Sequence, residues 1–526
     1  MLLASVTSSL HPIDYAIIAV YVVGTLLIGS YYSRHVSSAG DLLLAGKALP
    51  FWAIAMSVVV TDIGATNLTF GAGNAYKLGI SQANFDWIGS MPACVIAGLL
   101  FVPFFWRSGV YTIPEFLGRR YNKIVQRTSA LLWLGFLAIN LGIMMHASAV
   151  ILGSFVGFNY YLSVWGTGLV VGFYTVSGGL AAVVMTDALQ MIVIFIGTSA
   201  LLAVGLWEVG GFSGMQEKLA AMAAQGADTA NHLNLLLPHG TETALPWTAV
   251  VLSLGLLQST SYFANNQAIV QRNLGARTEW DAMAGMILAG LMKVFIPILI
   301  FVPGLIARAL FPDLADSNSA IPTMILELFP PGLTGLMVAA FLAAFMSGVS
   351  SYLNSTSTMF LADVYMPTYR SFAGRDIRDG HAMTVGRMTT VVSIVLACSA
   401  APLFDEKNVG QTIYNLIQTL MSIFYGPTLA IMLLGVLWKR ANQWGATAGL
   451  LLGVLLATYL TFRGGPLFAS KEPFLFITMI SFLFGVALVV IVSLLTPRDP
   501  DEKSNGLVLF DLVNRSPVTP PAEVRG

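Results

Sequence analysis

The chain has 526 residues, of which 56% are hydrophobic and 10% are charged. Soluble domains carry about 25% charged residues, so the composition argues against a water-soluble enzyme. The 26 basic and 26 acidic residues balance, which leaves no global field for binding nucleic acid. Both cysteines, Cys94 and Cys398, lie in apolar segments, which excludes a disulfide scaffold and a four-cysteine metal site. The sequence therefore predicts a polytopic membrane protein.

Apolar segments long enough to cross a bilayer recur along the whole chain, since one crossing takes about 20 residues. We expect thirteen spans, at 12–32, 51–73, 82–105, 128–154, 160–178, 184–207, 246–266, 281–307, 333–361, 383–402, 411–437, 443–462 and 474–495. The insert at 208–245 and the polar tail at 496–526 are too short to be catalytic domains. No HExxH motif or protease-like pair of carboxylates lies in the spans, so an enzyme is not expected.

Basic residues gather in alternate loops between these spans. One set of loops, in which we include Arg272, holds 19 Lys and Arg residues, and the other set holds 6. The positive-inside rule places the richer set in the cytoplasm. We therefore expect a multi-pass protein of the cell (inner or plasma) membrane, with its N-terminus outside and its C-terminus inside.

The second span, which contains SVVVTDIGATNLTFGAG, is interrupted near its middle by Asp62, Asn67 and several glycines. A broken helix exposes backbone carbonyls and amides, which the membrane tolerates only inside the protein or beside a wet cavity. Such a break is the best sequence indication of a transporter site. A glycine-rich packing surface is the alternative, and Asp62 makes it harder to accept.

The ninth span carries small polar residues on one helical face. They are Ser347, Ser350, Ser351, Asn354, Ser355 and Thr358. Hydroxyl and carbonyl oxygens without fixed charge suit Na⁺, whereas Ca²⁺ would need several carboxylates. Hydrogen bonding between helices explains the same pattern equally well.

Other polar residues lie in spans where lipid would exclude them. Asp187, at the start of the sixth span, could hold a cation or pair with a basic residue of the cytoplasmic loops. Lys293 is about twelve residues into its span, too deep to reach the interface easily, so we expect it to bind solute. Aromatic residues beside carboxylate, amide and ammonium groups are typical of a sugar or polyol site. The residues in question are Phe85, Asp86, Trp87, Ser259, Tyr262, Phe263, Lys293 and Gln418.

The seventh span, with QSTSYFANNQAIVQR, is a second candidate for a broken helix. It follows the broken second span by five, which is the spacing that an inverted repeat of five helices requires.

Several longer segments carry a family resemblance. They are VYTIPEFLGRRYN (110–122), YTVSGGLAAVVMTDALQ (174–190), NQAIVQRNLGA (266–276), VPGLIARALF (302–311), SSYLNSTSTMF (350–360) and GVLWKRANQWGATAGLLLG (435–453). In these the chain resembles the sodium/solute symporter family, and most closely its sodium–glucose cotransporter branch.

The resemblance implies an all-α membrane protein with a LeuT-type 5+5 inverted-repeat core and about 13 transmembrane helices. It divides the chain into an extra helix and loop at 1–50, a transport core at 51–437, two extra helices at 438–495 and a cytoplasmic tail at 496–526.

The resemblance also implies where sodium binds. The main site would use backbone carbonyls of Val60, Ile63 and Ala344, and hydroxyls at the positions of Ser347 and Gly348. Sugar-transporting members usually have serine where this chain has Gly348, so one ligand is missing or is supplied by water or a neighbour such as Ser351. A second site, present in some members, would use Asp187, Ser350 and Ser351.

For the solute, the matching positions are Asp62, Asn67, Asp86, Tyr262, Phe263, Lys293 and Gln418. Three of them depart from the family pattern, because Asp62 replaces asparagine, Asp86 replaces glutamate and Phe263 replaces tryptophan. With both carboxylates ionised the site is about one charge negative. Glucose therefore fits less well, and myo-inositol, another hexose or an amino-sugar stays open.

The leading hypothesis is alternating-access symport of Na⁺ with a sugar or polyol, by a monomeric transport unit in the lipid bilayer. A second hypothesis keeps the fold and changes the solute to a sialic or monocarboxylic acid or an amino acid. An uncoupled facilitator would result if Gly348 abolished sodium binding. A membrane sensor would need a signalling domain, and the tail shows no such pattern.

Overall fold

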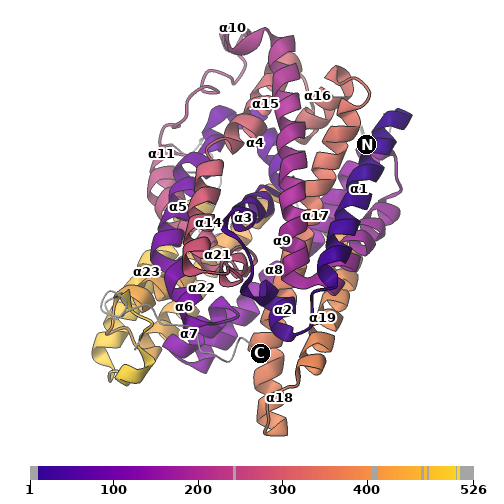
Figure 1. Cartoon of the computed structure of the whole chain (residues 1–526). Coiled ribbons are helices and arrows are strands. Elements are labelled where there is room, and N and C mark those ends of the chain that lie inside the picture. Colours follow the sequence, from indigo (N-terminus) through magenta and orange to yellow (C-terminus); the bar gives the residue numbers. More distant parts are fainter. Residues whose placement is uncertain are drawn as a thin grey trace.

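The computed structural model describes residues 10–240, 245–405, 413–463, 467–468, 470, 473–504 and 506–509. Within these residues the regular structure is helical, and β pairing is limited to two isolated bridges. Figure 1 shows long helices gathered into one bundle, with short helices at its two ends. The predicted all-α class is confirmed.

The long helices are α1 (Pro12–Ser33), α3 (Phe51–Thr66), α8 (Lys123–Val156), α9 (Tyr160–Val209), α14 (Glu279–Met292), α15 (Ile296–Leu310), α17 (Leu333–Met359), α19 (Asp379–Ala400), α21 (Ile413–Leu437), α22 (Gln443–Arg463) and α23 (Phe474–Leu495). The shorter ones are α2 (Ala39–Leu44), α4 (Ala72–Leu78), α5 (Met91–Ile96), α6 (Val102–Ser108), α7 (Ile113–Arg120), α10 (Gly211–Ala224), α11 (Trp247–Ala249), α12 (Ser259–Asn265), α13 (Gln267–Leu274), α16 (Ala320–Leu328) and α18 (Met366–Ala373). The described residues also form five π-helical turns: η3 (Asn67–Gly71), η5 (Phe85–Ser90), η6 (Ala97–Phe101), η7 (Val250–Gln258) and η9 (Phe360–Tyr365).

Among the described residues, ten helices are long and apolar enough to cross a membrane, or eleven with the bent pair Phe51–Gly64 and Asn67–Ala83. The thirteen predicted segments also fall mainly on helical residues, but the ends of the helices do not coincide with the ends of the predicted spans. The single helix α9 contains two of them, at 160–178 and 184–207, and is broken between them at Gly179 (φ 54°, ψ −151°). The segment at 246–266 corresponds to α11, η7 and α12.

The predicted break in the second span is present. Gly64 has φ 47° and ψ 165°, which only glycine adopts without strain, and the two halves of the bent pair meet at 61°. The Asn67 amide bridges the break, because its Nδ2 donates to the Asp62 carbonyl oxygen at 3.1 Å. Glycine thus ends regular winding here, and a side-chain amide satisfies one carbonyl that the break exposes.

The helix α17 forms the centre of the bundle, where it packs against α9, α3, α8 and α1. All six residues of its predicted polar face are buried. Because this face meets protein on every side, its hydroxyls are held against α3 and α13 and do not contact lipid.

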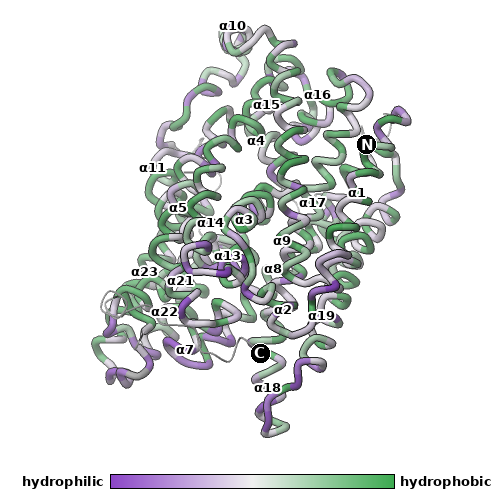
Figure 2. Tube along the Cα trace, viewed as in Figure 1, coloured by the Kyte–Doolittle hydropathy of each residue, from purple (hydrophilic) through white to green (hydrophobic). Residues whose placement is uncertain are grey.

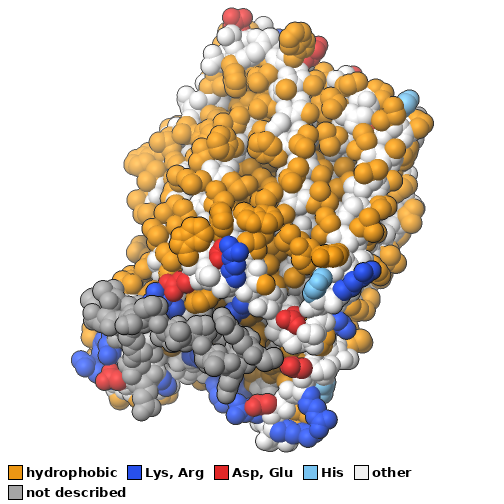
Figure 3. All heavy atoms as spheres, viewed as in Figure 1, with side chains coloured by type: hydrophobic (Ala, Val, Ile, Leu, Met, Phe, Trp, Pro, Cys, Tyr) orange, Lys and Arg blue, Asp and Glu red, His pale blue; other side chains and the backbone are white. Residues whose placement is uncertain are grey.

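The outside of the bundle is apolar around its middle and polar at its ends (Figures 2 and 3). Lys and Arg gather at the lower end of the face shown in Figure 3, the end where α2, α7 and α18 lie in Figure 1. The start of α1 lies toward the opposite end (Figure 1).

One residue of the loop count was placed wrongly. Arg272 belongs to α13, whose eight residues are all buried, so it is not a loop cation. The polar composition of NQAIVQRN favoured a loop, whereas the chain folds back here as a short helix inside the bundle. Residues 510–526 of the predicted tail lie outside the described residues.

A candidate solute and ion site at the break in α3

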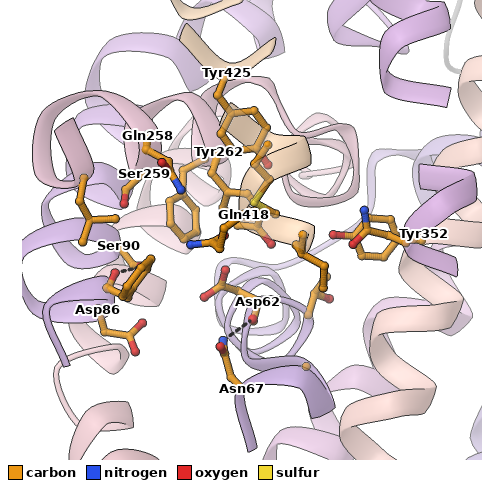
Figure 4. Close-up of a pocket in the computed structure, with 18 of the residues that line it drawn as sticks. Asp62, Asn67, Asp86, Ser90, Gln258, Ser259, Tyr262, Tyr352, Gln418 and Tyr425 are labelled. Atoms are coloured by element: carbon orange, nitrogen blue, oxygen red, sulfur yellow. Dashed lines mark hydrogen bonds between the residues drawn. The ribbon is translucent and has the colours of Figure 1, made fainter. Parts of the chain in front are cut away.

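A cavity lies beside the break in α3 (Figure 4). Its empty volume is about 890 Å³, including space open to solvent. Three of the wall elements, η3, η5 and η7, are π-helical turns, a geometry frequent at functional sites. The wall consists of Thr61, Asp62, Gly64, Asn67, Phe85, Asp86, Ser90, Asn140, Met144, Leu254, Gln258, Ser259, Tyr262, Phe263, Phe301, Tyr352, Ile417, Gln418, Met421 and Tyr425.

Seven of the eight predicted solute residues line this cavity: Asp62, Asn67, Asp86, Ser259, Tyr262, Phe263 and Gln418. They come from five separate elements, α3, η3, η5, α12 and α21. The structure therefore brings together residues that are up to 356 positions apart in the sequence, from Asp62 to Gln418.

The eighth predicted residue, Lys293, lies behind the wall. Its ammonium contacts carboxylate oxygens of both Asp62 and Asp86, and its side chain is 1% exposed, against 13% for Asp62 and 5% for Asp86. Lys293 follows the last residue of α14, where the chain turns before α15 begins at Ile296. One buried ammonium thus holds two carboxylates that face the cavity.

Aromatic rings form another part of the wall. The rings of Tyr262 and Phe263 are 5.1 Å apart, and Tyr262 is 6.2 Å from Tyr425. Trp87, which the sequence suggested for this face, does not line the cavity, because its indole N–H donates to the Val294 carbonyl oxygen at 2.9 Å. Trp87 instead joins η5 to the turn after Lys293.

Sequence reasoning missed several wall residues. They are Ser90, Asn140, Gln258, Tyr352 and Tyr425. Asn140 and Gln258 are polar residues within spans, so the rule that found Gln418 could have found them. Tyr352 and Tyr425 carry no such signal, because a tyrosine in an apolar helix is an ordinary core residue.

The residues implied for the main sodium site meet where α3 packs on α17. Val60, Ile63, Ala344 and Ser347 are fully buried. The Thr61 hydroxyl lies between the two helices, 3.4 Å from the Ser347 Oγ and 3.0 Å from the Ser351 Oγ. Buried hydroxyls beside a helix break are the uncharged oxygen donors that a hard monovalent cation accepts.

At Gly348, where relatives that transport sugars usually have serine, a side chain of another helix lies close by. A Cβ at this position would lie 3.2 Å from both the Sδ and the Cε of Met144 in α8. The chain therefore lacks a serine here and also has less room for one.

Asp187 is paired, and its partner is Arg272. The Arg272 Nη2 lies 3.2 Å from the Asp187 Oδ2, and both side chains are at most 1% exposed. Ser57 donates to the same Oδ2 at 2.5 Å and accepts from the Arg272 Nε at 2.5 Å. The predicted alternative of an ion pair is thus confirmed, with a buried partner in place of a loop residue.

The guanidinium of Arg272 also contacts residues implied for the second sodium site. Its Nη2 donates to the Thr61 Oγ1 at 2.7 Å and also to the Ser351 Oγ. Ser350, the third implied ligand, donates to the Ser347 carbonyl oxygen at 3.1 Å. Two of the three implied ligands therefore already contact a cationic side chain.

Comparison with known proteins identifies the family of this chain. The model of the sodium:solute symporter family matches residues 42–453. The chain belongs to this family. The predicted resemblance is therefore confirmed. The members of this family are transporters that use Na⁺ as the coupling ion.

Two relatives show how far the similarity of this family member extends. The sodium/glucose cotransporter of Vibrio parahaemolyticus is 29% identical, over 95% of this chain and 93% of the relative. The sodium/myo-inositol cotransporter 2 of Oryctolagus cuniculus is 30% identical, over 98% of this chain and 81% of the relative.

Solved structures confirm the LeuT-type fold of this family member. A Na⁺-coupled sialic acid symporter, in a substrate-bound outward-open state, superposes with a TM-score of 0.81 at 22% identity, over 93% of this chain and 99% of that one. A nucleobase-cation-symport-1 family transporter in a closed conformation gives a TM-score of 0.57 at 12% identity, over 88% of this chain and 97% of that one.

Proposed function

We propose that this protein carries Na⁺ together with a sugar or polyol across the membrane by alternating access. The observation behind the proposal is that neighbouring residues of α3, just before the break at Gly64, have different polar contacts. Thr61 and Asp62 both line the cavity, and the Thr61 hydroxyl also contacts the buried hydroxyls of Ser347 and Ser351 in α17. One broken helix thus connects a solute cavity to an ion site.

In this mechanism Na⁺ binds between the carbonyls of Val60 and Ile63 in α3 and the Ala344 carbonyl and Ser347 hydroxyl in α17. Binding fixes the broken helix against α17 and so shapes the cavity. The coupling between the two sites is reciprocal, so solute must raise sodium affinity by the same factor as sodium raises solute affinity. The membrane potential adds about 2.3 kcal/mol per charge per 100 mV.

The cavity wall supplies the groups that a polyhydroxylated ring needs. Tyr262 and Phe263 offer aromatic surface to the apolar face of the ring. Asn67, Ser259 and Gln418 offer both donors and acceptors to its hydroxyls. We assign direct solute contact to these five residues, and we assign to Lys293 the role of positioning Asp62 and Asp86.

We assign one Na⁺ to each transport cycle. The Arg272 guanidinium is bound to Asp187, Thr61 and Ser351, so a second sodium would meet a fixed positive charge. Sodium activation should then follow a Hill coefficient of 1. A coefficient near 2 would contradict this assignment.

We place the N-terminus outside and the C-terminus in the cytoplasm, with the monomer as the transport unit. The basic end of the bundle, where α2, α7 and α18 lie, supports this orientation.

An uncoupled facilitator is the second candidate, and the Met144 contact at Gly348 favours it. It predicts the same solutes and the same cavity, but transport without a sodium gradient.

The test is uptake of radiolabelled galactose, glucose and myo-inositol into proteoliposomes, with an inward gradient of Na⁺ or of K⁺. We expect uptake only with Na⁺, and loss of at least nine tenths of it in Tyr262→Ala. Ser347→Ala should raise the sodium concentration for half-maximal uptake about tenfold, since a hydrogen-bond-sized contribution is about 1.4 kcal/mol.

Ser177→Ala is the matched control for Ser347→Ala, because the Ser177 hydroxyl donates only to carbonyls of its own helix. Equal uptake in both gradients would favour the facilitator.

A further inference from the structure

The charges that face the cavity do not balance. Among the described residues that line it, the members of the Asp, Glu, Lys, Arg and His set are Asp62 and Asp86, and both are acids. The cation they share, Lys293, is a single ammonium behind them. With both carboxylates ionised, one ammonium leaves one negative charge, and a charge withdrawn from water without a partner is unstable.

Among the described residues, Lys293 is the one cation that forms an ion pair with Asp62 or Asp86. Arg272 pairs with Asp187, and its other bonds go to Ser57, Thr61 and Ser351. Adjacent residues of a helix point about 100° apart. Accordingly, Thr61 reaches the hydroxyls of α17, while Asp62 reaches Lys293 at the end of α14. The unbalanced carboxylate therefore belongs to the cavity and not to the ion site.

Asp62 is the more accessible of the two carboxylates, with a side chain 13% exposed against 5% for Asp86. Figure 4 shows its carboxylate directed into the cavity, between Asn67 on one side and Gln418 and Tyr262 on the other. The Phe263 ring already lies 6.0 Å from one ammonium, that of Lys293. Proteins bind organic ammonium groups against aromatic rings, and here a carboxylate lies beside such rings.

We infer that the solute carries a protonated amino group among its hydroxyls, as an amino-sugar or amino-polyol does. The inference rests on the proposed function and narrows its substrate class. The ammonium of the solute contacts Asp62 and restores neutrality, while Asn67, Ser259 and Gln418 bind the hydroxyls. An anionic solute is disfavoured, because its carboxylate would face Asp62 and Asp86.

The test compares D-glucosamine, N-acetyl-D-glucosamine and D-glucose on the full-length protein. The three share a ring, and only glucosamine carries a charged amine. In proteoliposomes with an inward Na⁺ gradient we expect glucosamine to reach half-maximal uptake at a concentration at least tenfold below that of the other two. Equal concentrations for glucosamine and glucose would overturn the inference.

Substitution of Asp62 shows whether this carboxylate makes the selection. Asp62→Asn should remove the preference for glucosamine over glucose, whereas Asp62→Glu should retain the preference. If Asp62→Asn instead weakened all three solutes and sodium by one common factor, Asp62 would serve the ion site and the inference would fail.

A binding measurement separates this inference from the proposed function. The thermal unfolding temperature of the purified protein in NaCl should rise with glucosamine and not with N-acetylglucosamine. If the unfolding temperature rose with glucosamine alone but no solute were taken up, symport would be contradicted and an amine-bearing solute would be supported. Sodium-driven glucose uptake with no response to glucosamine would support symport and overturn the solute class.

Discussion

Two buried charge clusters lie on different sides of α3, and they are built differently. The pair of Asp187 and Arg272 is balanced, and hydroxyls of Ser57, Thr61 and Ser351 surround it. The group of Asp62, Asp86 and Lys293 has one acid in excess, and its acids open on a cavity. A balanced cluster inside packed helices favours one arrangement, whereas an unbalanced cluster beside a cavity leaves a charge for a ligand to satisfy.

The largest expected effect belongs to the balanced cluster. Arg272→Met leaves the Asp187 carboxylate buried without its cation, which costs about 3–5 kcal/mol. We expect a large fall in thermal unfolding temperature in detergent and little folded protein. The double variant Arg272→Met with Asp187→Leu should recover most of the stability. If the single variant unfolded at the temperature of the natural chain, the ion pair would contribute nothing to the fold.

Removal of the cation from the cavity cluster should cost less stability and more transport. Lys293→Met leaves two carboxylates together, but Asp62 reaches the cavity and its water, so we expect about 1–3 kcal/mol. Solute uptake should fall by more than nine tenths. The double variant Lys293→Met with Asp86→Asn lacks the repulsion between the two carboxylates. It should recover more of the stability than of the uptake. Recovery of both to the same extent would mean that Lys293 acts only through charge.

A smaller effect is expected at Gly348, next to the ion site. Gly348→Ser adds a hydroxyl, and the flexible end of Met144 can move away from it. An extra oxygen ligand of about 1 kcal/mol should raise the apparent sodium affinity about fivefold. Gly348→Ala adds the same Cβ without the oxygen and is the matched control. If alanine raised the affinity equally, packing against Met144 would be the cause.

The smallest effect concerns pH and lies outside both clusters. Burial lowers the pKa of His232, in the segment between α10 and α11, and its Nε2 lies 3.0 Å from the Tyr76 carbonyl oxygen. The unfolded chain therefore binds a proton more readily than the folded one as the pH falls through about 6.5. Stability should decline below that pH and level off below the folded pKa of His232. His232→Gln should reduce the decline of the thermal unfolding temperature below this pH.

The sequence alone revealed the parts of this arrangement that interrupt apolar helices. Asp62 and the glycines around it predicted the break, and the spacing of Ser347, Ser351 and Ser355 predicted a buried polar face, because lipid admits such residues only inside a bundle. The excess negative charge at Asp62, Asp86 and Lys293 could also be counted in advance.

Other features needed the tertiary structure. Arg272 lies in a polar stretch that a hydropathy pattern assigns to a loop, yet α13 is fully buried. Likewise, whether Trp87 faces a cavity or a backbone carbonyl depends on where η5 sits relative to Val294. The domain boundaries and the ligand roles stay predictions.

The contact between Gly348 and Met144 has a consequence for how the family diversifies. The two positions share one small volume, on α17 and α8, although they are 204 residues apart. Relatives with a hydroxyl at the first position should carry a shorter or differently turned side chain at the second. We therefore expect the two positions to change together during evolution.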